Sequence, residues 1–79
     1  MKLKPLDAHK VIKALTKIGF AIVRRKGSHV IPKHEDGRLI VVPEHKGEQI
    51  SRGLLLKIIN DSKLSREEFV KLLRDRFSR

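Results

Sequence analysis

The 79-residue sequence contains no cysteine, tryptophan or tyrosine. Without cysteine the chain can form neither a disulfide framework nor a thiolate metal site, and an intracellular protein is the simplest expectation. No apolar run approaches the length of a secretory signal or of a membrane span. We therefore expect a soluble, cytoplasmic protein with no membrane partner.

Aromatic residues are scarce as well, since the only ones are Phe20, Phe69 and Phe77. Each stands at a position where the apolar pattern predicts a core residue. Proteins that bind single-stranded nucleic acid by base stacking need exposed aromatic side chains on their strands. The sequence therefore favours recognition of a nucleic acid through its backbone and its shape.

Positive charge is abundant, with 19 Lys and Arg residues against 9 Asp and Glu residues and a net charge of +10. Residues 1–47 hold eleven basic and four acidic residues, which leaves most of the excess in this part of the chain. Such an excess favours a polyanionic partner, and nucleic acid is the most economical one. A chain this short buries only about 60% of its unfolded surface, so we expect residues 1–79 to form a single domain with a thin core.

The apolar pattern predicts an α+β fold. Apolar residues in 8–18 recur at helical spacing, with Asp7 as a candidate N-cap and Gly19 as the end of the helix. Pro32 has no N–H to donate, so it predicts an edge or a bulge in its strand, and the unbroken apolar run 39–42 predicts a buried strand. The remaining predicted elements are strands at 20–24 and 29–34, a helix from about Ser51, and a short helix after the capping box Ser65-Arg66-Glu67-Glu68. We expect the helices to pack on one side of a three-stranded antiparallel sheet.

One basic stretch is the main candidate for a functional site. Its residues are Arg24, Arg25, Lys26, Gly27, Ser28 and His29. Arginine and lysine side chains match phosphate oxygens, and Gly27 lets the backbone approach a ligand or adopt a positive φ. Imidazole is the side chain best suited to exchange protons near pH 7. The combination suits chemistry on a phosphodiester, although an unspecialised, solvated strand edge would carry similar residues.

The other histidines are weaker candidates. His9 and His34 are most simply solvated, whereas His45 follows the third predicted strand and is a candidate for RNA contact or proton transfer, beside Lys46. The histidines lack the close helical pairing of metal motifs and have no dense carboxylate cluster beside them, so no metal site is predicted. Alternation along the second predicted strand places His29 and His34 on opposite faces.

A set of short motifs occurs in order along the chain. They are Gly19-Phe20, Arg25-Lys26-Gly27-Ser28-His29, Val42-Pro43-Glu44-His45-Lys46-Gly47-Glu48, and then Ile50, Gly53 and Leu55. This set, which extends over about residues 3–73, resembles the HicA toxins, small proteins with a double-stranded-RNA-binding-domain-like fold. Two positions depart from the family pattern: Pro32 replaces an apolar or aromatic residue, and Leu54 stands where threonine commonly follows the glycine.

The resemblance implies an mRNA interferase, an endoribonuclease that cleaves mRNA without the ribosome and is held inactive by a cognate HicB antitoxin. It also implies a single essential histidine, which maps onto His29. A base that removes the proton of an RNA 2′-OH permits attack on phosphorus without a metal or other cofactor, giving a 2′,3′-cyclic phosphate and a free 5′-OH. His29 is the candidate base or acid, with Lys26, Arg25 and the Ser28 backbone as candidates for stabilising the phosphorane charge.

A non-catalytic, double-stranded RNA-binding module is the alternative function. The same fold and basic face would hold the minor groove of an A-form duplex by shape. A lysine stripe on the first predicted helix either contributes to such phosphate contacts or simply keeps the protein soluble. Its residues are Lys10, Lys13 and Lys17.

Overall fold

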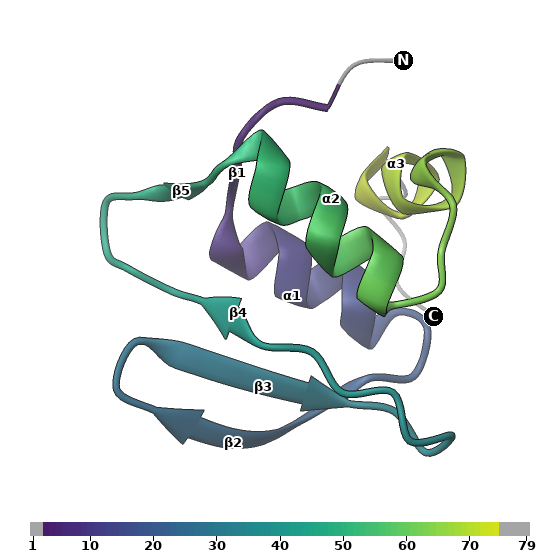
Figure 1. Cartoon of the computed structure of the whole chain (residues 1–79), viewed down its shortest axis with the longest axis horizontal. Helices are drawn as coiled ribbons and strands as arrows, with labels where there is room; N and C mark the ends of the chain where they lie inside the picture. Colours follow the sequence, from purple (N-terminus) through teal and green to yellow (C-terminus); the bar gives the residue numbers. More distant parts are fainter. Residues whose placement is uncertain (1–2, 75–79) are drawn as a thin grey trace.

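The computed structural model describes residues 3–74, which form a layer of helices over one side of a small antiparallel sheet (Figure 1). The elements in chain order are β1 (Leu6–Asp7), α1 (Ala8–Thr16), β2 (Ala21–Lys26), β3 (His29–Lys33), β4 (Val42–Pro43), β5 (Gln49–Ile50), α2 (Arg52–Asp61) and α3 (Arg66–Arg74). The main sheet has the order β2-β3-β4, and β1 pairs separately with β5. The architecture is α+β and double-stranded-RNA-binding-domain-like, as predicted. The small β1–β5 pair was not predicted, because strands of two residues are too short to leave a recognisable pattern in the sequence.

Pro32 lies in the central strand of the sheet and not at an edge. The predicted bulge is present on the neighbouring strand, where the β2–β3 register shifts between Ile22 and Arg24 opposite Pro32. The carbonyl of Pro32 accepts a hydrogen bond of 3.0 Å from the N–H of Ile40. The N–H that proline lacks would point the same way, toward the segment 39–43. The carbonyl of Ile40 consequently receives no bond from Pro32, which explains why pairing on this side is reduced to β4 and a single bridge between Lys33 and Leu39.

The prediction that the run 39–42 is buried throughout is wrong. Ile40 and Val42 are buried, but Leu39 and Val41 are 50% and 48% exposed. Helices cover only one face of the sheet, so alternate side chains of this edge segment point to the open face. Because the outward residues are as apolar as the inward ones, the sequence pattern concealed the alternation.

The core lies between the sheet and the three helices. Phe20 and Phe69 are buried as predicted, while Phe77 lies outside the described residues. Burial in α1 follows the predicted helical spacing, and Val30 of β3 closes the core from the sheet side. The buried apolar residues are Leu3, Ala8, Val11, Ile12, Ala14, Leu15, Phe20, Val30, Ile40, Val42, Ile50, Leu55, Ile58, Ile59 and Phe69.

The first helix begins without the predicted side-chain cap. Asp7 occupies the N-cap position with an extended backbone, but its carboxylate does not bond the helix N–H groups. Because Leu6–Asp7 pairs with β5, the Asp7 carboxylate instead accepts a long bond of 3.4 Å from the amide of Gln49. At the other end Gly19 has a φ of +100°, and the N–H of Phe20 reaches back to the carbonyl of Leu15, as expected for a helix that ends in a left-handed residue.

The third helix begins with the predicted capping box. The Ser65 N–H donates to Glu68 Oε1 at 2.8 Å, and the Glu68 N–H donates to Ser65 Oγ at 3.0 Å. The hydrogen bond from the Ser65 backbone N–H lowers the pKa of the Glu68 carboxyl, and the Ser65 side chain adds to this effect. None of the helices in the described part of the chain has the length and apolar content needed to cross a bilayer.

Candidate functional site

The candidate histidine lies at a tight turn between β2 and β3. Only Gly27 and Ser28 separate the two strands, and Gly27 has a φ of +57°, which suits the first central position of a two-residue type II′ turn. Nothing lies within 4 Å of where a Cβ of Gly27 would be, so the turn backbone is open to an approaching ligand. The turn presents Lys26 and His29 as its two flanking residues.

Lys26 and His29 share the open face of the sheet. They are direct partners in the antiparallel register, as are Arg24 and Ile31, and directly opposed residues project to the same side. Val30 points into the core, so its neighbour His29 must point away from the helices. Arg24, Lys26 and His29 therefore lie in one row on the face that no helix covers, and all three are exposed.

Arg25 lies on the opposite face from this row. It is the register partner of the buried Val30, and its Nη1 lies 2.8 Å from Oε1 of Glu44, which follows β4. Both side chains are well exposed, at 58% and 36%, so this ion pair adds little stability and competes with water. The three consecutive cations of the sequence therefore do not lie together on one face. Arg24 and Lys26 share the face of His29, whereas Arg25 forms an ion pair with Glu44.

His29 lines a hollow of about 460 Å³ between the edge of the sheet and α2. The apolar part of its wall comes from the edge residues Leu39, Val41 and Pro43 and from Leu54 and Ile58 of α2; Lys57 and Asp61 complete the lining. Among the described residues, the His29 ring has no hydrogen bond or ion pair, and it is exposed. The ring is thus accessible to a substrate group.

His45 belongs to a loop that is hydrogen-bonded to the β2–β3 turn. The N–H of Glu44 donates to the carbonyl of Ser28 at 2.6 Å, which fixes the start of the loop 44–48 against the β2–β3 turn. His45 lines a smaller hollow of about 250 Å³, and Pro43 and Leu54 line both this hollow and the one beside His29. Lys46 lines another hollow, of about 530 Å³, to which His45, His9 and Asp7 also contribute.

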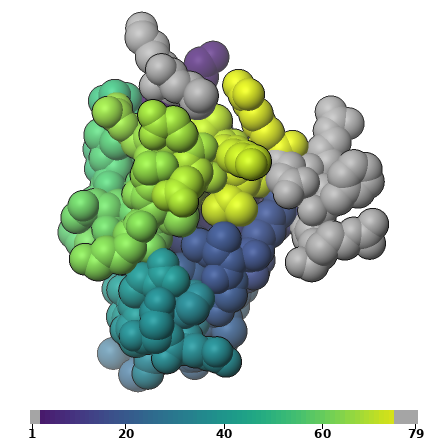
Figure 2. Space-filling view, turned by 90° about the vertical axis from the view of Figure 1, so that its right-hand side faces the viewer, coloured from purple at the N-terminus to yellow at the C-terminus, as the bar shows by residue number. Residues whose placement is uncertain are grey.

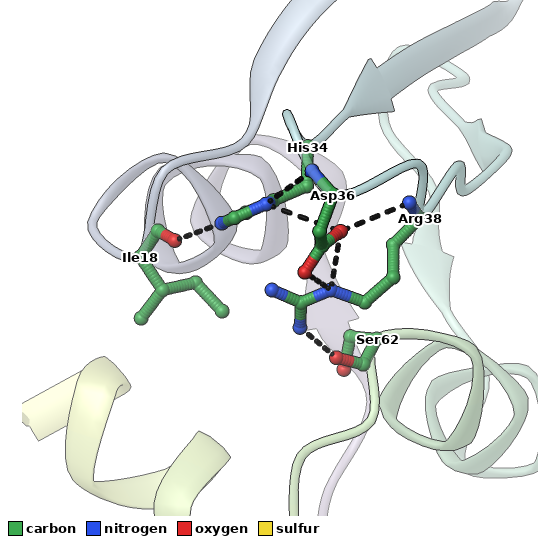
Figure 3. A network of polar contacts seen from close by, with 5 residues as sticks. All are labelled: Ile18, His34, Asp36, Arg38 and Ser62. Carbon is green, nitrogen blue, oxygen red and sulfur yellow. Dashed lines mark hydrogen bonds and ion pairs between the residues drawn. The ribbon is translucent and has the colours of Figure 1, made fainter.

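His34 is not solvated, contrary to the prediction. Its Nε2 lies 3.0 Å from the carbonyl of Ile18, and its Nδ1 accepts from the N–H of Asp36 at 3.2 Å (Figure 3). Its ring also meets Phe20 edge to face. The side chain is only 21% exposed. The physical reason is that the turn after β3 folds back onto the end of α1. His9, by contrast, is exposed as predicted.

Arg38 completes this structural network. It bonds both carboxylate oxygens of Asp36 through Nε and donates to the carbonyl of Ser62 at the end of α2 (Figure 3). Its guanidinium also lies over the ring of Phe20. Three distant segments meet on this side of the molecule, the turn near residue 38, the end of α1 and the end of α2 (Figure 2). The side-chain hydrogen bond from Arg38, followed by its backbone bond, lowers the pKa of Asp36.

The lysine stripe of α1 is only partly available to a ligand. Lys10 and Lys13 are exposed, but Nζ of Lys17 donates to the carbonyl of Leu72 in α3 at 2.8 Å. Within residues 3–74, no group of three or more His, Cys, Asp or Glu side chains is arranged to hold a metal ion. On the open face of the sheet, exposed cations and a proton-transfer group coincide in the row of Arg24, Lys26 and His29.

Sequence reasoning missed the hollow beside His29 and the Arg25–Glu44 pair. Both depend on how the segment 39–44 and α2 pack against the β2–β3 turn. Short-range sequence patterns do not predict this packing. A comparison with protein families finds that the family described as HicA toxin of bacterial toxin-antitoxin matches residues 8–64, well over half of the chain. No curated protein matches the chain.

Proposed function

Because this chain belongs to the HicA family of bacterial toxin-antitoxin toxins, we propose that it is an endoribonuclease that cleaves mRNA in the cytoplasm without a metal ion. The observation that carries the proposal is the pairing of Lys26 with His29 on the open face of the sheet, beside a turn with an unobstructed backbone. A cation next to an accessible imidazole supplies both charge stabilisation and proton transfer at one phosphate.

The proposed reaction is transfer of the phosphoryl group to the neighbouring 2′-oxygen. His29 either takes the 2′-OH proton or gives a proton to the leaving 5′-oxygen; the new P–O2′ bond replaces the P–O5′ bond. The products are a 2′,3′-cyclic phosphate and a 5′-OH, and no water is consumed. His45 is the nearest candidate for the second proton-transfer group, because its loop is tied to Ser28 through Glu44.

The RNA backbone is proposed to cross the open face of the sheet. Arg24 and Lys26 would hold phosphates on either side of the scissile bond, with the backbone of Gly27 and Ser28 close to the reacting phosphate. Arg25 and Lys46 would contact phosphates on the loop side of the turn, and Arg25 can do so only in exchange for its bond to Glu44. Backbone contacts of this kind give affinity without requiring exposed aromatic residues.

His29→Ala tests the proposal, with His9→Ala as the matched control because His9 is also an exposed histidine. Purified proteins are incubated with mRNA in excess EDTA, and cleavage rate, RNA affinity and thermal midpoint are measured together. We expect His29→Ala to lose about 10²–10⁴-fold in cleavage rate while it keeps its fold and most of its affinity. His9→Ala should cleave like the parent.

Two results would overturn the assignment of His29. Equal cleavage by His29→Ala would remove the residue from the chemistry, and a joint loss of cleavage, affinity and thermal midpoint would make its role structural. If the parent protein only retards RNA and never cuts it, the chain is a non-catalytic double-stranded RNA-binding module. That alternative is favoured by the fold itself, which resembles that of double-stranded-RNA-binding domains.

The family also implies an antitoxin, and we propose a HicB-like partner that covers His29 with an acidic surface. The net charge of +10 and the cationic row beside His29 favour such a surface. Co-expression followed by hydrogen exchange should show protection over residues 26–29. Protection restricted to residues beyond 60 would exclude this arrangement.

A further inference from the structure

The segment 39–43, which contains β4, leaves backbone groups unpaired at the edge of the sheet. The N–H groups of Ile40 and Glu44 donate to Pro32 and Ser28 of the β3 side, at 3.0 and 2.6 Å. Val42 pairs with Val30 of β3 as well, and in an antiparallel ladder the alternate residues turn their N–H and C=O groups the other way. Leu39 and Val41 therefore direct these groups away from β3, and within the described chain neither N–H has a hydrogen-bond partner.

This free edge borders the hollow that contains His29. Leu39 and Val41 are half exposed, and with Leu54 of α2 they give the hollow an apolar wall. Its volume of about 460 Å³ lies in the range of protein binding clefts, roughly 300–1,000 Å³. An unpaired edge beside an apolar hollow is the arrangement that proteins use to bind an extended segment as an added strand.

The charges around the hollow select the kind of segment that fits. Lys57 and Asp61 form an ion pair at 2.8 Å, so the α2 side of the wall carries no net charge from this pair. On the sheet side, the open face carries Lys26 beside His29 and Lys33 beside Leu39. None of the strand residues described on this face is acidic. The uncompensated charge is positive. It favours binding of an acidic segment over a basic one and attracts the acidic segment as it approaches.

We infer that the segment 39–43 is a docking edge for the partner antitoxin, which adds an extended segment of apolar and acidic residues as a fourth strand of the sheet. This inference rests on the proposed toxin function and specifies the surface and mode of neutralisation. The added strand bonds the N–H groups of Leu39 and Val41 and the carbonyls beside them. Its side chains fill the hollow over Leu54 and place acidic groups against His29, so substrate is excluded by occupancy of the site.

Val41→Glu and Val23→Glu form a matched pair of variants to test this. Both parent residues are exposed valines, 48% and 58%; Val41 immediately precedes the edge strand β4, and Val23 lies in the opposite edge strand β2. Each variant is co-expressed with the product of the reading frame that adjoins this chain's gene, and the affinity of the purified complex is measured. We expect Val41→Glu to weaken the complex at least about tenfold, a change of about 1.4 kcal/mol, and Val23→Glu to leave it unchanged.

Amide hydrogen exchange of the unmodified protein gives a second readout that does not depend on a variant. The N–H groups of Leu39 and Val41 should exchange rapidly in the free chain and slowly in the complex, while that of Val23 should exchange alike in both. A complex that forms and blocks cleavage but leaves Leu39 and Val41 unprotected would overturn the docking edge and leave the proposed function standing.

Three other results also overturn the inference, each in a distinguishable way. If RNA, and not the co-expressed protein, protects Leu39 and Val41, the edge belongs to the substrate. If the free chain protects them as its concentration rises, the occupant is a second copy of this chain. If the parent neither cleaves RNA nor binds the co-expressed protein, the proposed function fails together with the docking edge. Val41→Glu must keep the thermal midpoint of the parent, since the residue lies outside the core.

Discussion

Gly19 and His34 fit together so closely that a Cβ atom on residue 19 would lie 2.8 Å from Nε2 of His34. The ring cannot easily retreat, because the same Nε2 is hydrogen-bonded to the carbonyl of Ile18. Gly19 also has a φ of +100°, a conformation that favours glycine. The end of α1 and the turn after β3 are thus fitted to each other through the absence of a side chain.

Gly19→Ala should therefore destabilise the protein for two reasons, conformation and contact. Gly37 is the matched control, since its φ of +99° is almost the same but nothing lies within 4 Å of its Cβ position. The left-handed conformation alone costs about 1–2 kcal/mol, which we expect for Gly37→Ala. Chemical denaturation should show a larger loss for Gly19→Ala, and equal losses would mean that the His34 contact is inconsequential.

RNA binding should depend more on the cations that flank His29 than on Arg25. Replacing Arg24 and Lys26 with glutamine should lower RNA affinity for all sequences and reduce the slope of log affinity against log salt by roughly 1.5, at about 0.7–0.9 per released counterion. Replacing Arg25 alone should change the slope by less, because Glu44 already partly neutralises its charge. The control is Lys10→Gln with Lys13→Gln on α1; if that pair reduces the slope instead, RNA lies on the helix.

Asp36→Asn should remove one source of acid sensitivity. The hydrogen bonds from Arg38 lower the pKa of Asp36 below its ordinary value of 3.8, with the charges of Arg38 and His34 adding to the effect. A lowered folded-state pKa stabilises the protein fully above the unfolded-state value, and this stability is lost as pH falls through the folded-state pKa. Unfolding curves from pH 7 to pH 2 should show the parent more stable than Asp36→Asn above about pH 4 and the two converging below it. Glu35→Gln, at the neighbouring exposed carboxylate, serves as the control.

The capping box of α3 should contribute measurably to stability. Ser65→Ala removes an N-cap acceptor at 3.0 Å and the reciprocal arrangement with Glu68, which should cost about 1 kcal/mol in free energy of unfolding. Ser51→Ala is the comparison at the start of α2, where Ser51 accepts a longer bond of 3.3 Å from Leu54. We expect a smaller loss there, and the reverse order would show that α3 contributes less to global stability than α2.

Features encoded by neighbouring residues could be predicted from the sequence. The positive φ of Gly27, the capping box after Leu64 and the alternation along β3 all follow from residues that are close in sequence. The prediction that His29 and His34 lie on opposite faces rests on the same alternation. The match to the HicA family confirms the resemblance that these motifs suggested.

Features that depend on packing between distant segments could not be predicted. His34 looked solvated because its partners, Ile18 and Phe20, come from another part of the chain. Which of Arg24 and Arg25 lies on the open face depends on the register of β2 against β3, including its bulge. Burial of the run 39–42 was overestimated because apolar residues on an open face are indistinguishable in sequence from those in a core.

The partly exposed apolar run at 39–42 favours self-association of the protein. Short apolar segments with β propensity and a free edge are templates for self-association into stacked strands. Pro43 ends the run without an N–H, and the net charge of +10 keeps copies of the chain apart. Salt shortens the range of that repulsion from about 8 Å at physiological strength to about 3 Å at 1 M. Concentrated salt should therefore weaken the repulsion that keeps these free edges apart.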